Sequence, residues 1–337
     1  MKKLSFLHKI LYFINTILAL LLLFSFFIPQ LSPRTFSFFS IFGLFVPFLI
    51  IANVLFFLYW LVNLQKQMLL SFIILTVSWM FLTTLFVLTK DNSSNNSEVK
   101  IMSYNVRMFN HYKWSADTTI PNKIESLIHE NKPDILTIQE FSKKENVTFD
   151  YPYNFIKTKG EKNKFGMAIF SKFPVVNQGS LQLENTSNNI IFADVLINSD
   201  TVRVYNYHLQ SLKINPEEEN FGEKNSKVLV ANLNEKFKEQ AYQAEKFLVH
   251  EKMWKGKKIV CGDLNNTAYS WVYDKIRGDK KDAFLEAGNG FGKSFDFWFP
   301  MRIDFIFTDE ATAVNDFYVI DQKLSDHYPI VANISLN

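Results

Sequence analysis

The sequence predicts an α/β fold with mixed sheets, preceded by a three-helix transmembrane module. Two observations lead to this prediction. The first 90 residues contain three long uncharged stretches, whereas residues 100–337 contain many short strand-like runs and few helical patterns. A segment of roughly 240 residues is long enough for one large hydrophobic core. Because strand-like runs outnumber helical ones, mixed sheets fit the pattern better than a simple doubly wound sheet does.

The uncharged stretches of the N-terminal module run over about residues 10–29, 36–62 and 68–89. Each has roughly the 20 apolar residues needed to cross a hydrocarbon core about 30 Å thick. A soluble helix that is apolar on every face would have no polar side to turn towards water. Lys2, Lys3 and Lys9 resemble the basic start of a secretory signal, but no small-residue cleavage site follows. Three helices that span a lipid bilayer are therefore expected.

Positive charges near the spans predict the orientation, because cytoplasmic flanks carry an excess of Lys and Arg. The N-terminal flank has three Lys, whereas the loop after the first stretch has only Arg34. The N-terminus is therefore expected in the cytoplasm. Three spans would place the C-terminal domain on the opposite, periplasmic or external, face of a bacterial inner membrane. Residues 91–99, rich in Asn and Ser, are interpreted as a polar tether that keeps this domain near the bilayer.

The charge balance excludes a broad basic surface on the C-terminal domain. The whole chain has 36 basic and 33 acidic residues, but residues 100–337 have 30 and 31. Nucleic-acid surfaces normally show a clustered excess of Lys and Arg. Cys261 is the only cysteine, so an intrachain disulfide and a zinc cluster of thiolates are excluded. Its apolar neighbours, Ile259 and Val260, predict a small buried residue.

Short runs rich in Val, Ile, Phe and Tyr are typical of strands. They are Lys100–Asn105, Asp134–Ile138, Gly166–Phe170, Ile190–Ile197, Val202–Tyr207, Lys258–Val260, Ile303–Phe307 and Val314–Val319. Helical spacing is found at Ile124, Leu127 and Ile128, before Pro133, and again over Val228–Val249.

Acidic, amide and imidazole side chains directly follow several of these runs. Glu140 follows one strand-like run, Asp263 and Asn265 follow another, and Asp326 and His327 stand next to each other. A site that cleaves phosphoesters requires such groups, because hard oxygen ligands hold Mg²⁺ while neighbouring groups move protons. In an extended turn, Asp263 and Asn265 can point to one place. The carboxylate could deprotonate a water, and the amide could donate to charge on a phosphate oxygen.

Six segments of residues 100–337 together resemble the endonuclease/exonuclease/phosphatase superfamily, which includes deoxyribonuclease-like and neutral sphingomyelinase-like enzymes. The segments are, in order, MSYNVRMFN, LTIQE, NYHLQS, CGDLNN, RIDFIF and SDHYPI. The resemblance implies a four-layer α/β/β/α sandwich with two mixed sheets. It also implies a metal-dependent hydrolase acting on phosphoester bonds, with Mg²⁺ as cofactor and Mn²⁺ as the alternative.

The resemblance also assigns roles to residues. The metal is expected at Asn105, Glu140 and Asp326, and the catalytic residues are expected to be His208, Asp263, Asn265, Asp304 and His327. Asp304 is expected to hydrogen-bond to His327 and to favour its protonated form. Tyr207 stands where the family often has a small residue.

Some aromatic and imidazole side chains lie outside this assignment. His111, His129 and His250 are interpreted as surface residues. The aromatic cluster Phe291, Phe295, Phe297, Trp298 and Phe299 is interpreted as core or loop packing, with a substrate groove or a lipid contact as the alternative.

These observations predict a membrane-anchored, Mg²⁺-dependent phosphodiesterase or nuclease that works by in-line attack of a water activated by Asp263. One alternative is a phospholipid or sphingolipid phosphodiesterase at the membrane surface. It is favoured by the short tether and by the lack of the basic surface that suits duplex binding. Another alternative is a non-catalytic membrane-anchored interaction protein. The expected partners are a lipid bilayer and a phosphoester substrate, either nucleic acid or a phospholipid headgroup.

Overall fold

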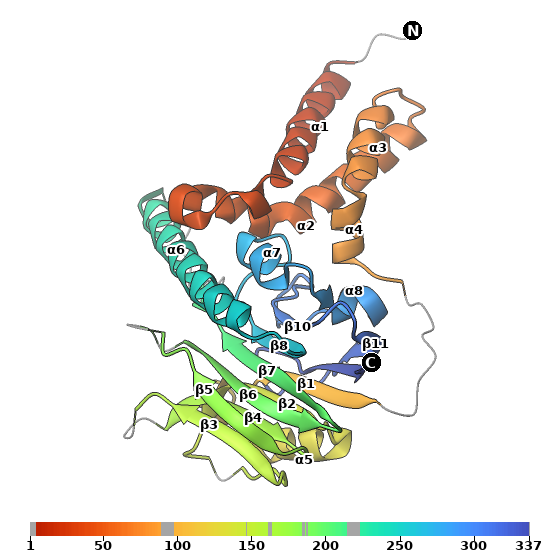
Figure 1. Cartoon of the computed structure of the whole chain (residues 1–337). Helices are drawn as coiled ribbons and strands as arrows, with labels where there is room; N and C mark the ends of the chain where they lie inside the picture. Colours follow the sequence, from red (N-terminus) through yellow and green to blue (C-terminus); the bar gives the residue numbers. More distant parts are fainter. Residues whose placement is uncertain are drawn as a thin grey trace. The chain divides into compact units, whose positions relative to one another are not determined.

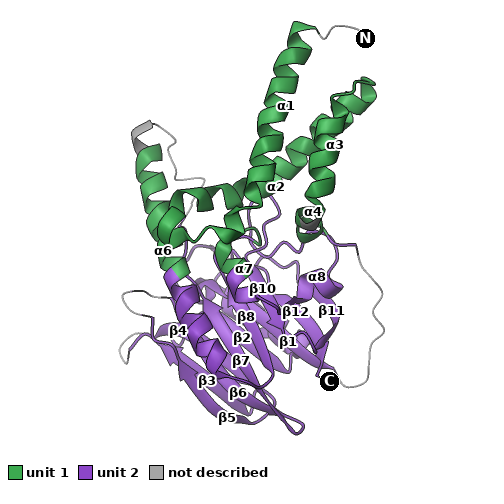
Figure 2. Ribbon diagram, turned by 45° about the horizontal axis from the view of Figure 1, so that its top comes forward, with its two compact units in different colours: residues 1–86, 214–241, 268–274 green, residues 87–213, 242–267, 275–337 purple. Residues whose placement is uncertain are grey.

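The structure is a computed structural model of the chain. It describes residues 5–88, 98–145, 147–160, 164–183, 186, 188–213 and 223–336. Of the predicted tether, residues 91–97 lie outside the described residues, and Val99 is the first residue of a strand. The chain divides into two compact units, shown in Figure 2. Unit 1 comprises residues 1–86, 214–241 and 268–274, and unit 2 comprises residues 87–213, 242–267 and 275–337.

The N-terminal helices of unit 1 follow the predicted apolar stretches (Figure 1). They are α1 (Phe6–Ser25), η1 (Ile28–Gln30), α2 (Pro33–Val62), α3 (Met68–Val77) and α4 (Trp79–Leu85). Ser5 and Ser32 cap α1 and α2, because their side chains accept hydrogen bonds from the backbone N–H groups of His8 and Arg34. Among the described residues, two helical segments are long and apolar enough to cross a membrane: Phe6–Gln30 and Pro33–Val62.

The third predicted span, residues 68–89, is not one helix. It divides at Ser78, whose φ of −82° and ψ of 13° depart from the helical range. The result is a helix of 10 residues followed by one of 7 residues. Neither reaches the roughly 20 residues that a span requires. The described residues therefore contain two candidate spans, and the prediction of three was wrong.

A buried polar cluster joins three of these helices. The Nδ2 atom of Asn15 donates to the Ser71 hydroxyl at 2.7 Å, and its Oδ1 accepts from the Trp60 indole at 3.1 Å. All three side chains are completely buried. A buried polar group is costly unless it is hydrogen-bonded, so these bonds set the register of α1, α2 and α3 against one another.

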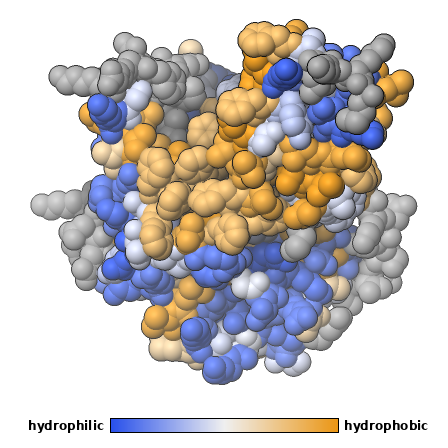
Figure 3. Space-filling model, turned by 90° about the horizontal axis from the view of Figure 1, so that it is seen from above, coloured by the Kyte–Doolittle hydropathy of each residue, from blue (hydrophilic) through white to orange (hydrophobic). Residues whose placement is uncertain are grey.

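The outer faces of the N-terminal helices are apolar and exposed. Large side chains such as Phe13, Leu20, Leu55 and Phe72 each have more than half of their surface uncovered. Figure 3 shows a broad area of hydrophobic side chains in the view from above. Exposed apolar areas of this kind are typical of surfaces that contact a membrane or a protein partner.

A distant segment, residues 268–274, belongs to the same unit. Tyr269 is 4% exposed and packs in a cluster with Leu22, Val46 and Ile50. Its hydroxyl donates to the Phe81 carbonyl at 3.1 Å. Gly43 permits the close approach of this segment, because a Cβ at that position would lie 3.3 Å from the Tyr269 carbonyl oxygen. The N-terminal helices therefore form a packed core together with residues from the C-terminal part of the chain.

The described residues of unit 2 form two six-stranded sheets. The first has the order β11 (Ala313–Val319), β12 (Ile330–Ser335), β1 (Val99–Asn105), β2 (Ile135–Ser142), β4 (Phe165–Ser171) and β3 (Tyr153–Thr158). The second has the order β5 (Val175–Ser180), β6 (Asn189–Ile197), β7 (Asp200–His208), β8 (Lys258–Asp263), β10 (Asp304–Thr308) and β9 (Lys281–Asp282). In each sheet one pair is parallel, β1 with β2 and β7 with β8, and the other pairs are antiparallel. Both sheets are therefore mixed, as predicted.

The two sheets bury one apolar core between them. Ile101 and Ile135 of the first sheet lie in one cluster with Ile191, Val204 and Ile259 of the second. Cys261 is buried in the same cluster, as predicted, and burial raises the pKa of its thiol to about 12.

Helices flank the two sheets. Helix α5 (Ile120–Asn131) buries Ile124 and Leu127 against the first sheet. In α6 (Glu223–Met253), Phe247 packs its ring at 5.1 Å from Tyr205 of the second sheet. The remaining described elements are η2 (Arg107–Asn110), α7 (Trp271–Arg277) and α8 (Ala283–Ala287).

Candidate active site

The sheet registers gather polar residues at one edge of unit 2. Parallel pairing places Asn105 beside Gln139, next to Glu140, and His208 beside Asp263. Antiparallel pairing of β10 with β8 places Asp304 beside Asp263. Side chains from both sheets therefore reach one place, although they are distant in the sequence.

Asn105 connects the two sheets at this place. Its Nδ2 donates to Asp263 Oδ2 at 3.1 Å and lies 3.5 Å from Glu140 Oε1. Its carbonyl oxygen accepts from the Ser325 hydroxyl at 2.8 Å. Burial, and then the nearby Asp326 carboxylate, raise the pKa of Glu140. Glu140 also has a φ of 51°, a left-handed conformation that non-glycine residues rarely adopt.

Asp263 is the most deeply buried of these carboxylates and has no exposed side-chain surface. Its Oδ1 accepts from the Asn265 backbone N–H at 2.6 Å, and its Oδ2 accepts from Asn265 Nδ2 at 3.1 Å. Asn265 Nδ2 also donates to the Leu209 carbonyl at 2.9 Å. Burial raises the pKa of Asp263 to about 6, although His327 opposes this effect. A carboxylate with such a pKa is ionised near neutral pH and is more basic than an ordinary aspartate.

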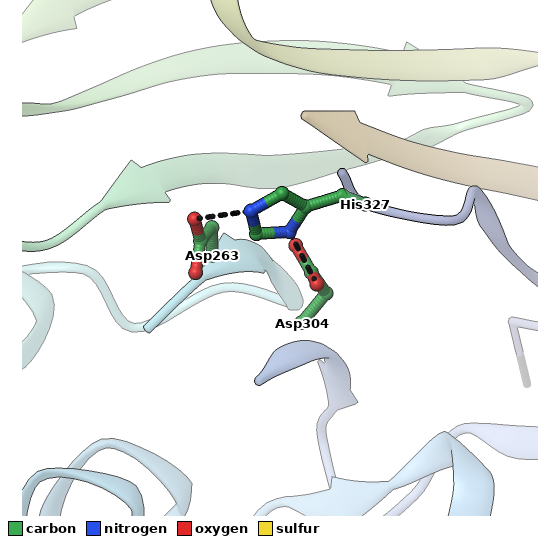
Figure 4. A group of neighbouring side chains, drawn as sticks. All are labelled: Asp263, Asp304 and His327. Atoms are coloured by element: carbon green, nitrogen blue, oxygen red, sulfur yellow. Dashed lines mark hydrogen bonds and ion pairs between the residues drawn. The ribbon is translucent and has the colours of Figure 1, made fainter. Parts of the chain in front are cut away.

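His327 lies between two aspartates, as Figure 4 shows. Its Nδ1 is 2.9 Å from Asp304 Oδ2, and its Nε2 is 3.7 Å from Asp263 Oδ2. Burial alone would lower the pKa of His327, but Asp304 and Asp263 outweigh it and raise the pKa to about 10. The ring is therefore cationic at neutral pH. The predicted pairing of Asp304 with His327 is present.

His208 approaches the group from the end of β7. Its Nε2 lies 3.7 Å from both Glu140 Oε1 and Asp263 Oδ2. Burial lowers the pKa of His208, only partly offset by Asp263. This imidazole is therefore neutral at neutral pH, in contrast to His327, so that one can accept a proton while the other carries a charge.

Asp326 lies at the more exposed side of the group. Its Oδ1 accepts from the Ser325 hydroxyl at 3.1 Å, and its Oδ2 lies 3.3 Å from Arg107 Nε. The structure thus brings together all eight residues that were predicted for the site, namely Asn105, Glu140, His208, Asp263, Asn265, Asp304, Asp326 and His327.

The donor set at Glu140 suits a hard divalent cation. Among the described residues, Glu140 Oε2 has no hydrogen-bond partner, and the repulsion between Glu140 and Asp326 raises the Glu140 pKa. A cation between these oxygens would relieve this repulsion. Asp263, Asp304 and His327 also place ligand atoms within 4.8 Å of one another. However, both imidazole nitrogens of His327 face carboxylates and the ring is cationic, so this trio suits proton transfer better than metal binding.

Sequence reasoning missed several residues that support the site. The Phe295 ring packs at 5.0 Å from the His327 ring, although its aromatic cluster had been interpreted as core or loop packing. Gln139 Nε2 donates to Asn206 Oδ1 at 2.8 Å and so links β2 to β7 just behind the catalytic residues. Gln139 directly precedes Glu140, and Asn206 stands two residues before His208, which is a signal in the sequence that could point to this link.

Two of the three histidines interpreted as surface residues are partly buried. His111 Nδ1 lies 2.7 Å from Glu145 Oε1, and His250 Nδ1 lies 3.0 Å from the Tyr205 hydroxyl. These two histidines are therefore partly covered surface residues, and hydrogen bonds from a loop and a strand hold their side chains. His129 is exposed, as predicted.

Family models match both parts of the chain. The model described as the Endonuclease/Exonuclease/phosphatase family matches residues 102–327, more than half of the chain. A second model, a domain of unknown function (DUF8431), matches residues 8–85. The comparison with curated proteins gave no match.

Solved structures share the fold. A humanized D. rerio TDP2 with 14 mutations is 17% identical, with a TM-score of 0.54 over 72% of this chain and 100% of that one. The human Nocturnin catalytic domain with bound sulfate is 18% identical, with a TM-score of 0.54 over 73% and 97%. An endonuclease/exonuclease/phosphatase from Bacteroides vulgatus is 17% identical, with a TM-score of 0.54 over 72% and 100%.

Proposed function

The chain belongs to the endonuclease/exonuclease/phosphatase family, whose members hydrolyse phosphoester bonds, and from this membership we propose a membrane-anchored, Mg²⁺-dependent phosphodiesterase with nuclease activity. One observation carries the proposal: the buried Asp263 carboxylate lies within 3.7 Å of two imidazoles that differ in charge. A structural ion pair would not need a second, neutral imidazole at the same carboxylate.

In the proposed reaction, Asp263 orients a water molecule and accepts its proton while the water oxygen attacks phosphorus. The ester P–O bond opposite the water breaks, and the leaving oxygen takes a proton from the solvent. Asn265 donates hydrogen bonds to both carboxylate oxygens of Asp263. These bonds fix the orientation of the carboxylate that accepts the proton. His327, charged through Asp304, would stabilise the negative charge that develops on the phosphate oxygens. His208 donates a hydrogen bond to the same phosphate. A positioned base contributes about 10²–10⁴-fold to the rate.

Glu140 would hold Mg²⁺, with Asn105 and Asp326 beside it. When bound there, the ion would neutralise charge on the phosphate oxygens and polarise the phosphorus. Hard oxygen ligands favour Mg²⁺, and Mn²⁺ accepts the same ligands.

The two long apolar helices would anchor the enzyme in a bilayer. In the most apolar 18-residue stretch of each helix, only 22% of Phe6–Gln30 and 33% of Pro33–Val62 is buried. This is too little for core helices of a soluble protein. A removable signal is the other use of such a helix, but Ala19 and Leu22 of α1 are completely buried against its neighbours. Removing α1 would uncover that core, so we favour retention.

With two spans instead of the three expected from the sequence, the chain would return to the side of its N-terminus. The Lys-rich flank favours the cytoplasm for that side, so the catalytic domain would lie there and not on the opposite face expected from three spans. Carbonate extraction of membranes that contain the full-length chain would test the anchor. The protein is expected to stay in the membrane fraction, whereas release into the supernatant would contradict the anchor. Protease accessibility in intact spheroplasts would then test the proposed side.

The alternative substrate is a phospholipid or sphingolipid headgroup. It is favoured by the exposed apolar faces of α1 and α2, which would hold the enzyme at a lipid surface. The deciding experiment gives the full-length protein, in detergent micelles, plasmid DNA and mixed phospholipids with Mg²⁺ or with EDTA. Cleavage of DNA that requires Mg²⁺ and is lost in Asp263→Ala supports the nuclease. Headgroup release alone would support the lipid enzyme, and no hydrolysis of either would oppose both.

A further inference from the structure

Arg107 lies beside the site, although the predicted mechanism gives it no role. Its backbone N–H donates to Asn105 Oδ1 at 3.1 Å, and its side-chain Nε lies 3.3 Å from Asp326 Oδ2. The guanidinium carbon is 5.0 Å from the centre of the Trp114 ring. An arginine that rests on an aromatic face is attracted to the π-electrons of the ring and is held in one orientation.

The backbone around Arg107 is unusual. Arg107, Met108, Phe109 and Asn110 have φ values of 42°, 52°, 53° and 63°. Each such residue costs free energy unless the surroundings enforce the conformation. Phe109 is completely buried and packs at 5.6 Å from Phe141, and the Asn110 side chain bonds to the backbone of the following loop. The buried neighbours therefore fix the direction in which Arg107 leaves the backbone.

Exposure increases outward from the centre of the site. The Asp263 side chain is fully buried, that of Asp326 is 30% exposed, and that of Arg107 is 40% exposed. Arg107 thus lies on the solvent side of Asp326, away from the water-activating carboxylate. Among the described residues, the guanidinium pairs with Asp326, with Nε as its nearest atom, and Nη1 and Nη2 donate no hydrogen bond. Their N–H groups can receive an anion in the planar, paired geometry that matches phosphate oxygens.

We propose that Arg107, supported by Trp114, binds a second phosphate of the substrate, next to the phosphate that is cleaved. This inference rests on the proposed function. At the centre of the site, His327 and the proposed cation already interact with the scissile phosphate. Arg107 lies beyond Asp326, on its solvent side. A chain of phosphodiesters, as in an oligonucleotide, presents a second phosphate at that place. A phospholipid with a single phosphate does not, so Arg107 makes the site selective for nucleic acid.

Two substrates that differ by one phosphate test this role. They are the p-nitrophenyl ester of thymidine 5′-phosphate and the same ester with an added 3′-phosphate. The full-length protein is expected to prefer the second substrate in kcat/KM by about 10- to 100-fold, the range for hydrogen bonds to a charged group. Arg107→Gln is expected to abolish this preference. Arg107→Lys should retain part of it, because it keeps the charge and loses the paired geometry. The matched control, Arg277→Gln, changes a partly exposed arginine that bonds to the Lys280 carbonyl, and it should keep the wild-type preference.

A binding measurement separates this inference from the proposed function, because it needs no turnover. Calorimetry with thymidine 3′,5′-bisphosphate is expected to show about 10-fold or greater weakening in Arg107→Gln and none in Arg277→Gln. If the wild type hydrolyses neither ester but the bisphosphate binds through Arg107, the proposed function fails and the binding role stands. If Arg107→Gln keeps the wild-type preference and affinity while its melting temperature is unchanged, the role of Arg107 is overturned.

Discussion

The pairing of Asp304 with His327 makes a quantitative prediction about pH. In Asp304→Asn the group that lies 2.9 Å from His327 Nδ1 loses its negative charge. Asp304 is one of the three carboxylates, with Asp263 and Asp326, that raise the His327 pKa to about 10. If the pKa falls to the ordinary value of about 6.5, the protonated fraction at pH 8 falls from about 99% to about 3%. Burial would lower it further. The variant should therefore lose about 30-fold in kcat/KM at pH 8, but less than about twofold at pH 6.

The assay is the ratio of variant to wild-type kcat/KM between pH 6 and pH 9 on a generic phosphodiester, together with NMR titration of His327. Circular dichroism establishes that the variant is folded. An equal loss at every pH, with the His327 pKa unchanged, would refute the argument that Asp304 acts by holding His327 in its charged form.

Three further predictions concern stability and metal binding. The folded-state pKa of Asp263, about 6, exceeds its ordinary 3.8. The folded protein therefore binds more protons between these pH values, and ionisation of Asp263 costs stability at pH 7. Asp263→Asn should be inactive yet up to about 3 kcal/mol more stable at pH 7 without metal, and the gain should vanish below about pH 4 in chemical unfolding. Mg²⁺ should raise the melting temperature of the wild type but not of Glu140→Gln. The control Glu235→Gln changes an exposed carboxylate and should respond like the wild type. An equal rise in all three proteins would show that the ion binds elsewhere. Tyr269→Ala should destabilise unit 1 by about 3–5 kcal/mol in detergent, the range for large aromatic truncations. The control Trp298→Ala changes an exposed side chain and should have little effect. Equal melting temperatures of the wild type and Tyr269→Ala would exclude a packing role for Tyr269.

The strand pattern and the site residues were largely predictable from the sequence. Each of the eight predicted strand-like runs overlaps an observed strand, and the two helical patterns fall within α5 and α6. The reason is physical: residues such as 167–170 are buried at every position of the strand, so the run is continuously apolar. Polar residues that end such runs are conspicuous, and the eight site residues were found by this contrast and by the family resemblance.

Other features could not be found in this way. Strands β3 and β5 lie at sheet edges and none of their residues is fully buried, so they lack a continuous apolar run. Arg107 and Phe295 reach the site through a left-handed backbone and a single β-bridge to His327, neither of which leaves a periodic pattern. The break at Ser78 was missed because hydropathy alone does not record where an apolar helix ends.

The most direct test of the account is the location of a bound metal ion. Anomalous diffraction from crystals of the full-length protein soaked in Mn²⁺ would locate the ion without reliance on catalysis. We expect one strong peak within coordination distance, about 2.0–2.6 Å, of a Glu140 carboxylate oxygen, with Asp263 and His327 nearby but not bound to it. A peak held instead by Asp263, Asp304 and His327, or no peak in unit 2, would contradict the proposed division between metal-binding and proton-transferring residues.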